Sequence, residues 1–402
     1  MSIPKGIILS SIKANGLTHR IATTAGIQIE SPFPKESTSF SHKCPGSKTS
    51  SKPLIMLLHG WPESWYSWRH QLTYLSTHGY STCAPDMRGY GGTEAPSDLK
   101  SYNIHALALD IVSIASSLGH EQFVVVGHDF GAYLAWRVAL LHPTRVVAVC
   151  GMSVPFVGVK SPKTCGPLEN LQQRYGWSLA ETIAGDVLPR EERLKARYQY
   201  MLHHCLPGAA EMYDQNVEEA LYRLYAYHPG VDCHDGPEVV DKKMFKLPPH
   251  GAEDVSLDAR VAPGCWLRIP KPMRLPSWLS QIDLDYYIRE FKGAGFAGGL
   301  NWYRSLDINW EATRRLGRES IDVPSLFIAG DEDAVIRAHG GAEFVRNRMS
   351  RTCRNLRGFI LLQGAGHWVQ QEEPDKVNAC LLKFLEETLR FSKNGNFERS
   401  KL

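Results

Sequence analysis

Short, continuous runs of apolar residues recur in the first part of the chain and again near its end, separated by segments long enough for helices. Apolar runs of this length are typical of strands buried on both faces of a parallel sheet. The runs predict strands over 54–58, 80–84, 123–126, 146–150, 325–329 and 359–362. Apolar residues at helical spacing predict helices over 104–118, 132–141 and 374–391. The alternation indicates an α/β fold with a mostly parallel central sheet and helices on both faces.

The alternation stops near Pro155 and resumes only before the strand expected at 325–329. The intervening segment lacks buried-strand runs and shows helical, aromatic-rich patterns. We therefore predict an α/β core of residues 1–155 and 316–402, split by a mostly helical cap (lid) domain of residues 156–315. Open α/β sheets bind ligands at the carboxyl ends of their strands, so the cap is expected above that edge.

The strand expected at 123–126 leads into the segment Gly127-His-Asp-Phe-Gly131, directly before the helix expected from Ala132. A glycine two positions before and two positions after a central residue is typical of a sharp strand-to-helix turn that presents a nucleophile. The central residue is Asp129, whose carboxylate is anionic at neutral pH because the pKa of a free Asp is about 3.9. Such an anion can attack an sp³ carbon directly and form an ester. An Asp that only caps the helix is the alternative, and the glycine frame argues against it.

Two further polar residues follow predicted strands and should meet Asp129 at the same edge of the sheet. His367 lies among small residues after one strand, and Asp333 lies directly after another. We predict that His367 activates a water molecule and that Asp333 orients its imidazole. Asp331 or Glu332 could orient it instead; Asp333 is preferred because this acid usually lies a few residues past the end of its strand.

Hydrolysis of an ester on Asp129 passes through an oxyanion, which needs hydrogen-bond donors. The backbone N–H of Phe130 is one candidate, because this residue directly follows the nucleophile. The second should come from the loop after the strand at 54–58, with the N–H of Trp61 in His59-Gly-Trp-Pro62 as the candidate.

These segments resemble the soluble α/β-hydrolase-fold epoxide hydrolases, from about residue 17 to about residue 390. The motifs that carry the resemblance are the turn around Asp129 and the segments His59–Trp68, Pro85–Gly91, Phe296–Arg304 and Gly364–His367. The resemblance implies an α/β-hydrolase fold. It also implies an enzyme that converts an oxirane and water to a vicinal diol through an Asp129 ester.

A haloalkane dehalogenase is the alternative, because it would use the same Asp129, Asp333 and His367. It also needs N–H donors for a halide, commonly from a Trp just after the nucleophile. Phe130 occupies that position and has no side-chain donor, although Trp61 could serve. A protein of the same fold that only binds a ligand is a further alternative, and a complete nucleophile, base and acid argue against it.

The resemblance also implies two cap tyrosines that hold the epoxide oxygen. Tyr303 matches one of them, and Tyr200, a few residues before Pro207-Gly208, matches the other, with Tyr198 as the alternative. Both tyrosines, together with Trp61, are expected to contact the substrate. A phenol with a pKa near 10 can donate a proton without being ionised. Aromatic core packing is the plainer role for any single Tyr in this region.

Two segments depart from the family pattern: 229–276 is longer than expected between cap helices, and 33–52 is polar. We expect the first to shape the substrate entrance and the second to form a surface loop between two early strands. The cluster Asp232-Cys-His-Asp235 and the pair His203-His204 lack the paired spacing of zinc sites, so no metal is expected. No cofactor is expected either.

The overall balance of charge is nearly neutral, with 45 basic and 42 acidic residues and a net charge of +3. This balance gives no reason to expect a nucleic-acid partner. The nine cysteines are scattered without a CxxC pair, which favours a reducing compartment. No signal peptide and no apolar segment of about 20 residues is evident, so we expect a soluble, non-secreted protein without a membrane span.

The chain ends in Ser400-Lys401-Leu402 after a polar tail. A free C-terminal S-K-L is the address read by the peroxisomal import receptor. We therefore expect that receptor as a partner and a peroxisomal location, or a cytoplasmic one otherwise. Together with an aromatic, apolar cap, this address favours a small hydrophobic epoxide as the substrate.

Overall fold

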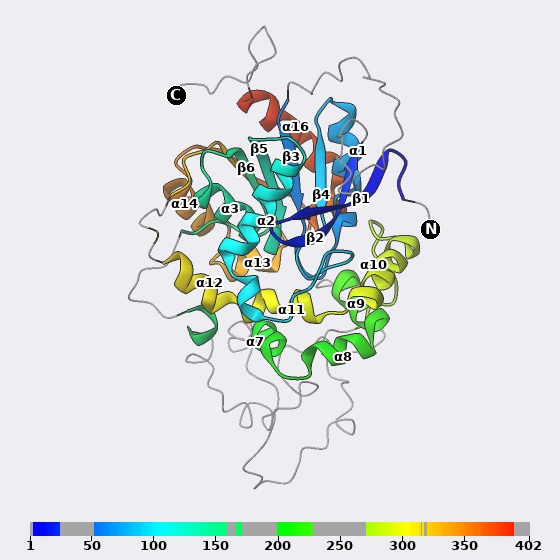
Figure 1. Ribbon diagram of the computed structural model, residues 1–402. Helices are drawn as coiled ribbons and strands as arrows, with labels where there is room; N and C mark the ends of the chain where they lie inside the picture. Colours follow the sequence, from blue (N-terminus) through cyan, green and yellow to red (C-terminus); the bar gives the residue numbers. More distant parts are fainter. Residues whose placement is uncertain are drawn as a thin grey trace, which may run out of the picture.

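The computed structural model describes residues 3–24, 52–158, 166–170, 199–227, 271–314, 316 and 320–389. Eight strands form one sheet in the order β1-β2-β4-β3-β5-β6-β7-β8. Their bounds are β1 Ile7–Ala14, β2 Leu17–Thr24, β3 Leu54–Leu58, β4 Thr82–Pro85, β5 Phe123–His128, β6 Val146–Met152, β7 Ser325–Gly330 and β8 Leu356–Leu362. Strand β2 pairs antiparallel with β1 and β4, and all other neighbours are parallel. The predicted, mostly parallel sheet is thus confirmed (Figure 1).

Burial on both faces explains why the central strands could be predicted from apolar runs. Every residue of β3, β5, β6 and β7 is buried. The first residues of two strands were predicted wrongly, and β5, β6 and β7 each end one or two residues later than expected. Strand β4 begins two residues later than expected, at Thr82. Strand β8 begins earlier than expected, at Leu356. Its first residues do not form an apolar run, because they are exposed or only partly buried and include the polar Arg357.

The core helices form two layers on the sheet, where α2 packs against α3, and α1 packs against α16. The predicted helices over 104–118 and 132–141 correspond to α2 and α3, and α16 ends earlier than the expected 391. Helix α2 begins after Asn103, whose side chain accepts hydrogen bonds from the N–H groups of His105 and Ala106. The core helices are α1 Arg69–Thr77, α2 Ile104–Ser117, α3 Phe130–Leu141, α13 Ala334–Ala338, α14 Ala342–Thr352, α15 Val369–Glu372 and α16 Pro374–Thr388.

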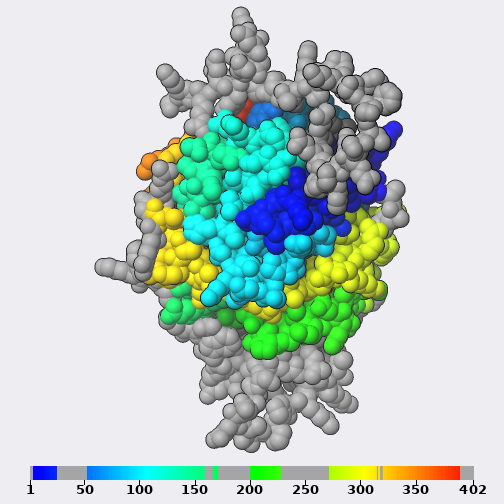
Figure 2. Space-filling model, viewed as in Figure 1, coloured from blue at the N-terminus to red at the C-terminus, as the bar shows by residue number. Residues whose placement is uncertain are grey.

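A group of short helices between β6 and β7 lies along one end of the core (Figure 1). In the space-filling view they form a continuous green and yellow surface against the core (Figure 2). They are α7 Gln199–Cys205, α8 Ala209–Gln215, α9 Val217–Ala226, α10 Gln281–Ala294, α11 Ala297–Arg304 and α12 Leu306–Thr313. The domain boundaries at 155 and 316 stay a prediction. The loop expected at 33–52 and the segment 229–276 lie almost entirely outside the described residues.

Polar contacts dock this helical layer, called the cap below, onto the core. The hydroxyl of Tyr66 donates to Asp283 at 3.0 Å, and the indole N–H of Trp302 donates to the backbone carbonyl of Arg88 at 2.9 Å. Arg20 of β2 forms ion pairs with Asp86 of the core and Glu290 of α10. Helix α11, which carries Trp302, is therefore fixed relative to the strand ends beneath it.

Within the described part of the chain, no helix is long and apolar enough to cross a membrane. Five of the nine cysteines fall in that part, and all five are free thiols. Cys83 and Cys150 are buried in β4 and β6, as small apolar side chains would be.

Candidate active site

Asp129 occupies the sharp turn between β5 and α3. Its backbone has φ 52° and ψ −119°, a conformation that non-glycine residues rarely adopt outside functional sites. The turn also explains both flanking glycines. A Cβ on Gly127 would lie 2.1 Å from the carbonyl oxygen of Gly131, and a Cβ on Gly131 would lie 2.0 Å from that of Leu58. No larger side chain fits at either position. The two glycines therefore permit the tight turn that holds Asp129 at the edge of the sheet.

His367 and Asp333 meet Asp129 at this edge. The Nε2 atom of His367 lies 3.5 Å from Oδ2 of Asp129, and its Nδ1 atom lies 3.1 Å from both carboxylate oxygens of Asp333. Asp331 instead accepts a hydrogen bond from the N–H of Gly364 at 2.8 Å. Of the open candidates for the orienting acid, Asp333 is therefore the one whose carboxylate contacts the imidazole.

Asp129 and His367 each shift the pKa of the other group toward its charged form. Burial disfavours the charged form of Asp129, but hydrogen bonding and attraction from His367 outweigh it and lower the pKa of the carboxyl below its ordinary value. Burial likewise disfavours the charged form of His367, but Asp333 and Asp129 raise the pKa of the imidazole well above its usual value. The resting site therefore pairs a carboxylate with an imidazolium.

The loop after β3 supplies a hydrogen-bond donor to the carboxylate. The backbone N–H of Trp61 donates to Oδ1 of Asp129 at 3.0 Å. Gly60 permits this approach, because a Cβ there would lie 2.4 Å from the Cβ of Asp129. Phe130, the second predicted donor, is the first residue of α3 and directly follows the nucleophile.

The cap places Tyr303 beside Trp61, and Tyr200 beside Tyr303. Tyr303 of α11 is buried, and its ring centroid lies 4.6 Å from that of Phe130 and 5.6 Å from that of Trp61. The ring of Tyr200, on α7, lies 6.0 Å from that of Tyr303. Tyr198 lies outside the described residues. Burial, then Tyr200 and the charge of Asp129, raise the pKa of Tyr303 well above 10, so its phenol keeps its proton.

A buried polar pair under the site was not identified from the sequence. Nδ1 of His128 lies 2.6 Å from Glu63, and Nε2 of His128 lies 2.8 Å from the backbone carbonyl oxygen of His367. Glu63 also accepts from the N–H of Gly60 at 2.9 Å and from the side chain of Gln370 at 3.1 Å. The pair thus connects the Trp61 loop, the turn at Asp129 and the His367 loop. Residues 63 and 128 are 65 positions apart, so no local pattern reveals the contact.

The residues that the structure describes contain no group of three or more His, Cys, Asp or Glu side chains that could hold a metal ion. His204 is buried, and its Nε2 lies 2.9 Å from the hydroxyl of Tyr213. Burial lowers the pKa of His204 well below its usual value, so its ring is neutral. The cluster at 232–235 lies outside the described residues.

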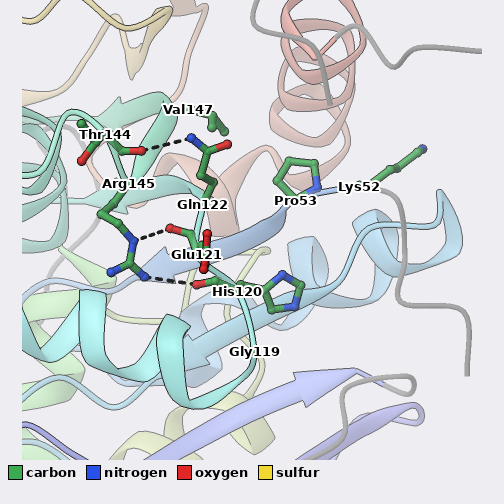
Figure 3. Close-up of a pocket in the computed structure, with 9 residues that line it drawn as sticks. All are labelled: Lys52, Pro53, Gly119, His120, Glu121, Gln122, Thr144, Arg145 and Val147. Carbon is green, nitrogen blue, oxygen red and sulfur yellow. Dashed lines mark hydrogen bonds between the residues drawn. The ribbon is translucent and has the colours of Figure 1, made fainter. Parts of the chain in front are cut away.

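A surface pocket of about 600 Å³ lies at the opposite end of the sheet (Figure 3). Lys52 and Pro53 precede β3, Gln122 precedes β5, and Arg145 precedes β6. Asp129 follows the carboxyl end of β5, so this pocket is separate from the catalytic groups. The side chains of Gln122 and Arg145 are already bonded to backbone carbonyls.

A carboxylate on a strand-to-helix turn, with a histidine and a second carboxylate at neighbouring strand ends, is the arrangement typical of the α/β-hydrolase fold. Comparison with known proteins agrees: the family model for the alpha/beta hydrolase fold matches residues 53–229. Epoxide hydrolase A of Mycobacterium tuberculosis (strain ATCC 25618 / H37Rv) is 38% identical over 335 residues, which is 83% of this chain and 90% of the relative. Epoxide hydrolase 3 of Siraitia grosvenorii is 33% identical, over 83% of this chain and 92% of the relative.

Solved structures give the same result. Epoxide Hydrolase A from Mycobacterium thermoresistibile has a TM-score of 0.67 and 33% identity, covering 94% of this chain and 98% of its own. An epoxide hydrolase from Vigna radiata has a TM-score of 0.69 and 28% identity, covering 95% and 99%. The chain belongs to the α/β-hydrolase-fold epoxide hydrolase family. It is therefore a hydrolase, and its relatives do not favour the haloalkane dehalogenase alternative.

Proposed function

We propose that this enzyme converts an oxirane and water to a vicinal diol through an ester on Asp129. The observation that carries the proposal is the position of Tyr303 of the cap beside the turn at Asp129. Its ring lies 4.6 Å from that of Phe130, the next residue, and the charge of Asp129 is among the causes that raise the pKa of its phenol. In the first step, Oδ2 of Asp129 attacks a ring carbon and the carbon–oxygen bond of the strained ring breaks. The departing oxygen takes a proton from Tyr303 or Tyr200.

The two carboxylate oxygens of Asp129 have different environments, which supports this assignment. Oδ1 accepts the N–H of Trp61, the position that an ester carbonyl oxygen needs for stabilisation as an oxyanion. Oδ2 faces His367 and has no backbone donor among the described contacts, so it is the oxygen that we assign to the attack on the ring carbon.

In the second step, His367 accepts a proton from water, and the resulting hydroxide attacks the carbonyl carbon of the ester. The negative charge develops on the oxygen held by the N–H groups of Trp61 and Phe130. The bond between the acyl carbon and the substrate oxygen then breaks, and the diol leaves with a proton from the imidazolium. The carboxyl group of Asp129 passes its remaining proton to His367, which restores the resting pair of carboxylate and imidazolium.

Formation of the ester itself prepares His367 for this role. In the resting enzyme, the carboxylate of Asp129 helps to hold the pKa of His367 high. Ester formation removes that negative charge, so the pKa of His367 falls. The imidazolium then gives up its proton, which by way of solvent restores the phenol that lost its proton in ring opening, and a neutral imidazole becomes available as a base. Asp333 keeps its contact with Nδ1 throughout and fixes the orientation of the ring.

The surroundings of the reacting groups favour a small hydrophobic epoxide. The ring of Tyr303 contacts those of Trp61 and Phe130, and both of these residues flank Asp129. Aromatic walls with few polar groups suit an apolar substrate whose one polar atom is the ring oxygen.

The reaction class is tested by incubating the protein separately with a styrene-type epoxide and with a haloalkane. We expect diol from the epoxide, and no halide beyond the background rate. Asp129→Ala should abolish diol formation. The control Asp98→Asn should retain it, because Asp98 is an exposed residue at the start of the short helix Leu99–Tyr102 in the core. Halide release without diol would favour the dehalogenase instead, and diol formation by D129A at the wild-type rate would exclude Asp129 as the nucleophile.

For location, we propose that Ser400-Lys401-Leu402, where it is the free carboxyl end, binds the peroxisomal import receptor. These residues lie outside the described part of the structure. A fluorescent protein fused to the amino end of the chain should enter peroxisomes, and removal of the three residues should leave it in the cytoplasm. An unchanged distribution would refute this proposal without affecting the proposed chemistry.

A further inference from the structure

The short loop that carries His367 joins β8 to α15 and is held by side chains from several elements. The carbonyl oxygen of His367 accepts hydrogen bonds from Ser153 Oγ at 2.9 Å and from His128 Nε2 at 2.8 Å. Glu372, the last residue of α15, binds two backbone N–H groups of the same loop. Its Oε2 accepts the N–H of Gly366 and its Oε1 accepts the N–H of Trp368, both at 2.7 Å.

We propose that Glu372 is a positioning residue for ester hydrolysis, because one carboxylate holds the peptide N–H on each side of His367. This inference rests on the proposed function, in which His367 activates the water that cleaves the Asp129 ester. Glu372 touches neither substrate nor water in this account, and it acts through the backbone that carries the imidazole.

The demands on the imidazole explain why a backbone clamp is needed. Nδ1 of His367 is bonded to Asp333, and Nε2 must stay free to take a proton from water. Only one edge of the ring can therefore be tethered, and the direction of Nε2 depends on the peptide from residue 366 to residue 368. A displacement of about 1 Å at a reacting group can slow a step about a hundredfold.

Ring opening makes no such demand on Glu372. Asp129 is positioned by the turn between β5 and α3 and by the N–H of Trp61, and Glu372 has no described hydrogen bond to either element. A defect in the clamp should therefore slow the second step and leave the first unchanged. A general loss of stability would not separate the two steps in this way.

The chemistry of the clamp requires a group that only accepts hydrogen bonds. Burial raises the pKa of Glu372, while the two N–H groups and the nearby His367 favour its charged form and Asp333 opposes it. A glutamine has the same shape but turns an NH₂ group toward one of the two backbone N–H groups. Glu372→Gln thus replaces one hydrogen bond by a contact between two donors, with no change in volume.

The test is a rapid-mixing experiment with enzyme in excess over epoxide, which follows ester formation and ester decay separately by quenched mass spectrometry. We expect E372Q to form the ester at the wild-type rate and to hydrolyse it about tenfold to a hundredfold more slowly. The matched control is Glu373→Gln, since Glu373 is the next residue and pairs with Lys376 at the surface. E373Q should behave as wild type in both steps.

Hydrolysis by E372Q at the wild-type rate, or an equal slowing of both steps, would overturn the inference. Absence of any ester in the wild-type enzyme would instead refute the proposed function. Should E372Q fail to fold, Gly366→Ala provides a second test, because the added Cβ would lie 3.1 and 3.2 Å from the two carboxylate oxygens of Glu372 and displace them. G366A should also slow ester decay alone, and normal decay would overturn the inference.

Discussion

The two sides of the active site are held in place by different forces. On the core side, Asp129, His367 and Asp333 follow parallel strands and are joined by polar contacts of 3.1 to 3.5 Å. On the cap side, Tyr200 and Tyr303 lie on short helices, and their described ring contacts have centroids 4.4 to 6.0 Å apart. Directional bonds join the core groups to one another, whereas the two cap tyrosines contact each other through their rings.

The difference matches the two chemical steps that we propose. Hydrolysis of the ester needs a proton acceptor, a water molecule and an oxyanion site, and the core side provides all the protein groups for it. Ring opening needs the nucleophile of the core and the phenols of the cap together. Changes on the core side should therefore affect either step according to the residue, and changes in the cap should affect ring opening alone.

The largest expected effect comes from His367→Gln. Without the imidazole, the ester should still form but decay about a thousandfold more slowly or worse, since general-base catalysis by a histidine is lost. Intact-protein mass spectrometry should then detect Asp129 carrying one substrate molecule. His142→Gln is the control, because His142 lies at the far end of α3 from Asp129, and it should show no adduct. A failure of H367Q to accumulate the adduct would contradict the division of roles.

Tyr303→Phe should have the next largest effect. Loss of one donor to the epoxide oxygen should slow ester formation about a hundredfold, with ester decay unchanged. Tyr222→Phe is the matched control in the same layer, because the hydroxyl of Tyr222 donates to the carbonyl of Pro272 instead. Pre-steady-state kinetics measure both steps. Slower ester decay in Y303F would show that the cap also serves the second step.

Acidification should separate the steps by about tenfold per pH unit. Below the pKa that His367 has in the ester state, protonation removes the base and hydrolysis slows by that factor. The pKa of Asp129 is held below its ordinary value by His367, so the nucleophile stays ionised and ring opening continues. The wild-type enzyme should therefore accumulate ester at mildly acidic pH. Equal pH dependence of the two steps would argue against His367 acting as a base in ester hydrolysis alone.

Tyr225→Phe should have the smallest effect. Tyr225 of α9 donates a hydrogen bond to the carbonyl of Pro62 in the core, and its ring stacks on Tyr287. Removal of the hydroxyl should lower the free energy of unfolding by about 1 kcal/mol, measured by urea denaturation. The exposed Tyr227 provides the control. A loss of several kcal/mol would show that hydrogen bonds, and not packing, dominate the attachment of this layer.

The sequence predicted the core side better than the cap side for a physical reason. Strand β3 was predicted with its observed bounds because all five of its residues are apolar and buried. The turn at Asp129 was recognisable because only glycine fits at 127 and 131. His367 and Asp333 were then predicted from their places directly after strands. They meet Asp129 because the carboxyl ends of parallel strands lie at the same edge of the sheet.

Contacts between segments far apart in the chain could not be predicted in the same way. The cap tyrosines were assigned by resemblance, because a buried tyrosine that packs and one that donates a proton have the same local pattern. Glu63 and His128 form a buried pair that only the folded chain brings together. The clamp by Glu372 is local in sequence, but it depends on the path of the backbone and not on a side-chain pattern.

The central claim, that the nucleophile is Asp129 and not water, is tested most directly by isotope transfer. The enzyme, in excess over epoxide, is allowed one turnover in ¹⁸O-water, and both the diol and the peptide that contains Asp129 are analysed by mass. Our account predicts an unlabelled diol and one ¹⁸O atom in the carboxylate of Asp129. A labelled diol with an unlabelled Asp129 would contradict it.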